Sequence, residues 1–95
     1  MSAYVVVDLD VKDASALRDY ASEVPSIVAQ YGGRYLVRGG RFEVLEGNWK
    51  PKSLIIIEFP TLDAVKRWYE SEEYRPYRSV RLRAAETNIV GVEGG

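Results

Sequence analysis

The pattern of hydrophobic and polar residues along this chain predicts four strands separated by helical segments and turns. Segments rich in β-branched and aromatic residues predict strands at 3–9, 34–45, 53–59 and 87–92. The second of these is interrupted by Gly39 and Gly40, which predicts a bulge or bend within one extended strand. Residues 46–52 carry turn chemistry, so the second and third strands are expected to form a hairpin.

Apolar residues at intervals of three and four predict a first helix between the first two strands. Asp13 is expected to be its N-cap, and the pair Gly32 and Gly33 is expected to end it. Pro25 lies inside this segment, where a missing amide hydrogen and a ring clash disfavour a helix by about 3 kcal/mol. We therefore expect a kink or an early break at Pro25.

A second helical region is expected to start at Thr61, an N-cap, and to continue as a piece capped by Ser71 over 72–85, interrupted near Pro76. The element order is then strand, helix, strand, strand, helix, strand. This order predicts a ferredoxin-like α+β fold, in which a four-stranded antiparallel sheet carries both helices on one face. With 95 residues, we expect a single domain spanning 1–95.

The two strands expected at the centre of this sheet, 3–9 and 53–59, are mostly apolar on both faces. One face would bear Val5, Val7, Leu9, Ile55, Ile57 and Phe59, and the other Tyr4, Val6, Asp8, Leu54, Ile56 and Glu58. An antiparallel sheet with one wet face normally alternates apolar and polar residues. Because the helices cover only one face, we expect a second copy of the chain to cover the other, sheet against sheet.

The chain contains neither histidine nor cysteine. This excludes disulfides, thiolate metal sites, iron–sulfur clusters, histidine-ligated haem and histidine-dependent triads. No calcium-loop spacing of carboxylates occurs, so we expect no metal and no cofactor. The net charge of −1 and the absence of a long apolar run favour neither nucleic acid nor a membrane as a partner, and we expect a cytoplasmic location.

Glu58 is the first candidate for catalysis, because a carboxylate on an apolar central strand is costly to bury without a partner. A shielded Glu58 would have a raised pKa and would suit the role of general base. Arg38 precedes the glycine bend, and its planar guanidinium suits a substrate carboxylate or phosphate. The alternative is structural, with Glu58 forming an ion pair to Arg38 or to the other subunit.

Five more residues are candidates for binding a ligand. Tyr4, Val6 and Asp8 share the expected sheet face with Glu58, and Trp68 and Tyr74 would edge it with aromatic rings. Two alternatives stay open: the helical spacing of Trp68 favours core packing, and the position of Asp8 near a strand end favours exposure.

Four arginines form a basic run near the end of the second helical region, at Arg75, Arg78, Arg81 and Arg83. A ferredoxin-like sheet is also an RNA-recognition scaffold. However, the aromatic strand motifs of that class are missing and glutamates nearby neutralise the arginines. We interpret the run as a solvated helix face and expect no nucleic acid as partner.

Several short strings in the chain together carry a family resemblance: YGGRY at 31–35, RGG at 38–40, LEGNW at 45–49, IEFP at 57–60 and AVKRWYESEEY at 64–74. With them the chain resembles the DUF1330 family, a domain of unknown function in the dimeric α+β barrel superfamily. The resemblance covers nearly the whole chain. It implies a ferredoxin-like fold whose sheets pair into a dimeric barrel, and it implies no catalytic residues.

Two functional hypotheses follow. In the first, a homodimer holds a small organic molecule, such as an anion, at the sheet face and acts as a cofactor-free enzyme, with Glu58 as the base and Arg38 stabilising negative charge. In the second, the dimer is a non-catalytic structural or interaction module whose sheet face is only the subunit interface.

Overall fold

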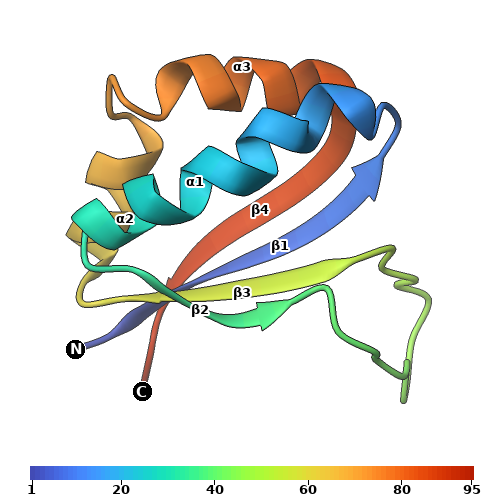
Figure 1. Ribbon diagram of the computed structural model, residues 1–95. Coiled ribbons are helices and arrows are strands. Elements are labelled where there is room, and N and C mark those ends of the chain that lie inside the picture. Colours follow the sequence, from blue (N-terminus) through green and yellow to red (C-terminus); the bar gives the residue numbers. More distant parts are fainter.

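The computed structural model describes residues 1–95 and contains one antiparallel sheet that is covered on one face by helices (Figure 1). The four strands lie in the order β2-β3-β1-β4. In chain order the elements are β1 Ala3–Val11, the 3-10 helix η1 Ser15–Leu17, α1 Arg18–Gln30, β2 Arg34–Arg38, β3 Leu54–Phe59, α2 Leu62–Tyr69, α3 Arg75–Ala84 and β4 Ala85–Glu93. The predicted ferredoxin-like α+β fold is confirmed, with β1 and β3 at the centre of the sheet.

Of the caps predicted at Asp13 and Thr61, the structure confirms the one at Thr61. The Asp13 carboxylate accepts a hydrogen bond from the backbone N–H of Ala16 at 3.2 Å, but the N-cap residue is Ala14 for η1 and Leu17 for α1, so the prediction of Asp13 as the N-cap was wrong. The Thr61 hydroxyl accepts from the backbone N–H of Ala64 at 3.0 Å and caps α2. Local side-chain chemistry thus starts α2 where the sequence predicted, whereas η1 and α1 begin without a side-chain cap.

Neither proline interrupts a helix in the way that the sequence predicted. Helix α1 contains Pro25 and continues to Gln30, with Val24, Ile27 and Val28 buried on its inner face. Burial of such side chains contributes roughly 1.5–3 kcal/mol each, enough to offset the proline penalty. Pro76 lies in the first turn of α3, where its missing N–H would have no helical partner. None of the helices combines the length and the apolar composition that a membrane span requires.

The prediction of one long second strand was wrong. Strand β2 ends at Arg38, and the following residues up to Ser53 form a loop that projects away from the sheet (Figure 1). Gly39 adopts a φ of 72°, and its N–H donates to the Leu54 carbonyl at 2.8 Å. Beyond this bond the segment 41–45 has no strand to pair with, so its alternating pattern does not produce a strand.

The core lies between the sheet and the helices, and the opposite sheet face has no cover in one chain. Fully or almost fully buried side chains come from both layers: Val5, Val24, Val28, Phe59, Trp68 and Tyr74. On the opposite face Tyr4, Val6, Leu54 and Ile56 are only partly buried, and on β4 Val90 is 60% and Val92 48% exposed. We call this second surface the outer sheet face.

Candidate functional site

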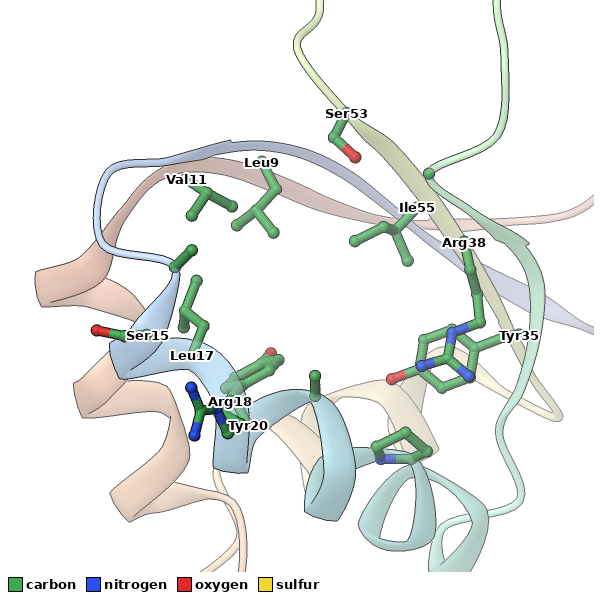
Figure 2. Close-up of a pocket in the computed structure, with 14 residues that line it drawn as sticks. Leu9, Val11, Ser15, Leu17, Arg18, Tyr20, Tyr35, Arg38, Ser53 and Ile55 are labelled. Atoms are coloured by element: carbon green, nitrogen blue, oxygen red, sulfur yellow. The ribbon is translucent and has the colours of Figure 1, made fainter.

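The main hollow of the molecule is a cleft of about 700 Å³ between the η1–α1 segment and the helix-covered face of the sheet (Figure 2). We call it the α1 cleft. Leu9, Val11 and Ile55 point into it from the strands, facing Leu17 and Tyr20 of the helical segment. Its remaining lining residues are Ala14, Ser15, Arg18, Ala21, Pro25, Tyr35, Arg38, Gly39 and Ser53.

The charged side chains that line the α1 cleft are arginines, and no aspartate or glutamate is among its lining residues. Arg18 and Arg38 stand on opposite sides of the space in Figure 2. The guanidinium carbon of Arg38 lies 4.6 Å from the centre of the Tyr35 ring, a cation–π contact that helps to hold its side chain. The cleft is therefore locally positive although the whole chain carries a net charge of −1.

A β-bulge places Arg38 in this cleft. In the β2–β3 register Arg34 pairs with Glu58 and Tyr35 with Ile57, but Val37 pairs with Ile56 and Arg38 with Ile55. The register shift at Leu36 adds one residue to β2, and this reverses the alternation of faces beyond it. Arg38 therefore shares the helix-covered face with Ile55 instead of the outer sheet face with Glu58.

Three polar side chains form a hydrogen-bonded chain that reaches the α1 cleft from the interior. The hydroxyls of Tyr20 and Tyr74 are hydrogen-bonded to each other, and the Nε–H of Arg81 donates to the Tyr74 hydroxyl at 3.3 Å. Tyr74 is 0% and Arg81 2% exposed, whereas Tyr20 lines the cleft. Burial is the main cause that raises the pKa of Tyr20, and the nearby Tyr74 adds to it, so the Tyr20 hydroxyl stays protonated.

The structure corrects the interpretation of the basic run, because Arg81 is buried and not part of a solvated face. It also corrects the place of Trp68 and Tyr74, which do not edge the outer sheet face. Trp68 is 2% exposed and stacks on Tyr74 with ring centres 4.5 Å apart, beneath the helices and against Phe59 of β3. The core alternative is therefore the right one for Trp68.

Glu58 lies on the outer sheet face and is already partnered there. Its carboxylate accepts from the Arg34 Nε–H at 2.7 Å and from the Tyr4 hydroxyl at 3.3 Å. The Arg34 hydrogen bond is the main cause that holds the pKa of Glu58 below its usual value. The structure therefore contradicts both the raised pKa and the ion pair with Arg38, although an ion pair as such is present.

Asp8, at the other end of the outer sheet face, anchors the β2–β3 loop. Its carboxylate accepts from the backbone N–H of Lys52 at 2.9 Å and from the indole N–H of Trp49 at 3.0 Å. The Lys52 bond is the main cause that lowers the pKa of Asp8. These contacts give Asp8 a structural role in this chain, with Trp49 left 58% exposed beside it.

Comparison with known proteins agrees with this fold. The model of a protein family described as a domain of unknown function, DUF1330, matches residues 2–95. The chain belongs to the DUF1330 family. No curated protein is similar enough to this DUF1330 chain to count as a match.

Solved structures show how widely the fold of this DUF1330 domain is used. A protein of unknown function from Rhodopseudomonas palustris, RPA0582, matches with a TM-score of 0.78 and 16% identity, over 99% of this chain and 82% of that one. SnoaB, a cofactor-independent oxygenase from Streptomyces nogalater, matches with a TM-score of 0.67 and 12% identity, over 99% and 93%. The de novo designed protein Foldit4 matches over the whole of both chains, with a TM-score of 0.61 and 9% identity. At these identities the likeness is one of fold.

The sheet of the DUF1330 domain separates the residues that the sequence grouped into one site. Tyr4, Val6, Asp8 and Glu58 lie on the outer sheet face, whereas Arg38 lies across the sheet from them. Sequence reasoning missed Tyr20 and Arg81 as site residues, because one follows the apolar spacing of a helix and the other sits in a basic run. One signal was present in the sequence: Tyr20 occupies an apolar position of the first helix. A buried tyrosine hydroxyl requires a hydrogen-bond partner, so this position indicated a polar contact in the interior.

Proposed function

We propose that this domain is a homodimeric binding protein for a small organic anion, which it holds in the α1 cleft of each subunit. The observation that carries the proposal is the composition of the cleft: mostly apolar walls, with Arg18 and Arg38 as the charged residues and no carboxylate. A ligand with an apolar body and a negative group matches both features.

The size of the α1 cleft supports this proposal. A volume of about 700 Å³ falls within the range of roughly 300–1,000 Å³ that is typical of small-molecule sites. The sheet offers rigid strands as one wall, and α1 offers a helix as the other (Figure 2). The hollow next to Glu58 is smaller, about 270 Å³, and Arg34 already pairs with the carboxylate there.

Pairing through the outer sheet face is the second part of the proposal. This face presents apolar side chains on all four strands, and no segment of the chain covers them: Val6, Val37, Leu54, Ile56, Val90 and Val92. The pairs Glu58–Arg34 and Asp8–Trp49 mark its two ends. A second copy placed sheet to sheet would bury the apolar surface and leave the polar ends at the rim.

A non-catalytic interaction dimer is the second candidate function, and one observation favours it. Glu58 and Asp8 are both held by neighbouring side chains or backbone, so neither is free to act as a base on the outer sheet face. The likeness to a cofactor-independent oxygenase concerns a fold that hosts many functions. Binding is therefore the function that we propose, and catalysis without a cofactor would have to use the α1 cleft.

Native mass spectrometry of freshly purified protein, followed by denaturation of the same sample, tests both parts. We expect a dimer with a consistent extra mass of a few hundred daltons that denaturation releases. The variant Ala21→Trp fills the cleft and should lose the extra mass, whereas Ala29→Trp, on the same helix but outside the cleft, should retain it. A dimer without extra mass supports the interaction module, and a monomer contradicts the sheet-to-sheet pairing.

A further inference from the structure

Arg81 is a buried cation that no carboxylate neutralises. It is 2% exposed, and the four salt bridges of the molecule do not include it. Its Nε–H donates to the Tyr74 hydroxyl, and one Nη atom is buried without a hydrogen-bond partner. A buried guanidinium without a counter-ion opposes folding, because it loses hydration and gains little in return. Because the buried charge of Arg81 opposes folding, we looked for a functional role for it.

The hydrogen bonds of this cluster have a definite direction. A guanidinium only donates, so the Tyr74 oxygen is the acceptor of the Arg81 bond. Tyr74 is fully buried, and the oxygen of Tyr20 is the only acceptor within hydrogen-bonding distance of its hydroxyl. If Tyr20 donated instead, the Tyr74 proton would be buried without an acceptor, which is unfavourable. The bonds therefore run from Arg81 to Tyr74 to Tyr20.

This direction leaves the Tyr20 proton free at the wall of the α1 cleft. We propose that Tyr20 donates a hydrogen bond to an oxyanion of the molecule in the cleft, and that Tyr74 and Arg81 are positioning residues that orient and polarise its hydroxyl. The oxyanion is a carboxylate, phenolate or sulfonate group. The inference rests on the proposed function, since it requires a ligand in the cleft.

The charges around the α1 cleft agree with this ligand class. Arg18 and Arg38 also line the cleft, and no acidic side chain is among its lining residues. Successive hydrogen bonds that start at a cation polarise each other, which makes the last hydroxyl a stronger donor than an isolated one. A preorganised neutral donor of this kind stabilises negative charge in addition to any ion pair with the arginines.

Two fluorescent probes with the same aromatic body separate this inference from the proposed function. 8-Anilinonaphthalene-1-sulfonate carries a sulfonate, and N-phenyl-1-naphthylamine is its neutral counterpart. We expect Tyr20→Phe to weaken binding of the sulfonate probe by about tenfold, as for the loss of a hydrogen bond to a charged group, and to leave the neutral probe within about twofold. Tyr31→Phe is the matched control, because Tyr31 bonds Glu73 at the surface and does not line the cleft.

Arg81→Met tests whether Arg81 positions Tyr20 or only stabilises the fold. The two roles predict different combinations of Tm and affinity for the sulfonate probe. Because the variant removes an unneutralised buried charge, we expect an unchanged or higher Tm together with weaker binding of the sulfonate probe. Adding Arg81→Met to Tyr20→Phe should cause no further loss, since Arg81 acts through Tyr20. Arg81→Lys keeps the charge and should recover part of the affinity.

Each outcome of the probe experiment has one meaning. Selective loss of the sulfonate probe in Tyr20→Phe supports the inference. Equal losses of both probes, or no loss, overturn it and leave the proposed function in place. If Ala21→Trp abolishes the binding of neither probe, or if neither probe binds the parent protein, the α1 cleft is not a binding site. Both the proposed function and the inference then fail.

Discussion

Arg38 and Glu58 lie on opposite faces of the same sheet, although regular alternation from Arg34 would place both on one face. Arg34 pairs with Glu58, and the register shift at Leu36 then brings Arg38 opposite Ile55. One extra residue thereby moves the guanidinium from the outer sheet face to the α1 cleft. A guanidinium and a carboxylate that would otherwise neutralise each other are kept apart.

This separation predicts different effects for two charge-removing variants. Arg38→Met should weaken binding of 8-anilinonaphthalene-1-sulfonate by about two- to fivefold, the size expected for a solvent-exposed ion pair. Glu58→Gln should not change that affinity, because its carboxylate faces the other side of the sheet. Fluorescence titration at low ionic strength measures both, and an equal loss in the two variants would show that the charges act on one site.

The outer sheet face predicts a second result, on oligomeric state. Val6 lies on central strand β1, opposite Ile56, and is only partly buried in the single chain. Val6→Lys should convert the proposed dimer to a monomer at micromolar concentration, because two lysines would be buried in its symmetric interface. Size-exclusion chromatography with light scattering checks this. Leu82→Lys, at a residue of α3 that is 62% exposed, is the control and should remain dimeric.

The fold was largely readable from the sequence because its signals are local. Caps such as Thr61, the apolar spacing of α1, and the β-branched segments of β1 and β3 all act within a few residues. The failures arose where a distant partner decides the outcome. Segment 41–45 has a strand pattern but nothing to pair with, and Pro25 is tolerated because Val24, Ile27 and Val28 around it are buried against the core.

The candidate site was less predictable than the fold, because the position of Arg38 in it depends on one residue, Leu36, that has no partner on β3. No local signal in RYLVR marks Leu36 as a bulge, so the face on which Arg38 lies could not be deduced. The burial of Arg81 could not be deduced from the sequence either. Its burial follows from the packing of α3 against α1 and η1, whereas the sequence shows only one arginine in a basic run.

Gly33 predicts a stability effect that arises from close packing. A Cβ at this position would lie 2.6 Å from Val28 Cγ1 and 2.8 Å from Phe59 Cε2, both in the core. Gly33→Ala should therefore lower the free energy of unfolding by about 1–3 kcal/mol, the usual cost of overpacking. Urea denaturation measures it. Gly40→Ala is the matched control, since nothing lies within 4 Å of its Cβ, and it should change stability by less than about 1 kcal/mol.

Asp8 predicts a pH-dependent loss of order confined to the β2–β3 loop. Hydrogen bonds from Lys52 and Trp49 lower the pKa of Asp8, so the ionised form stabilises the folded loop. This stabilisation is complete above the unfolded pKa of about 3.9 and is lost as the pH falls through the lower, folded value. Hydrogen exchange of the Lys52 amide and the Trp49 indole should therefore accelerate in that acidic range before the strands exchange.

Two variants decide whether Asp8 causes that change. Asp8→Asn removes the titrating group, so its loop should exchange faster at neutral pH and show no further step in acid. Asp10→Asn is the control, because Asp10 pairs with Lys12 at 3.0 Å and does not contact the loop. It should retain the acid step of the parent protein. If the step persists in Asp8→Asn, another carboxylate holds the loop, and the lowered pKa of Asp8 has no part in its order.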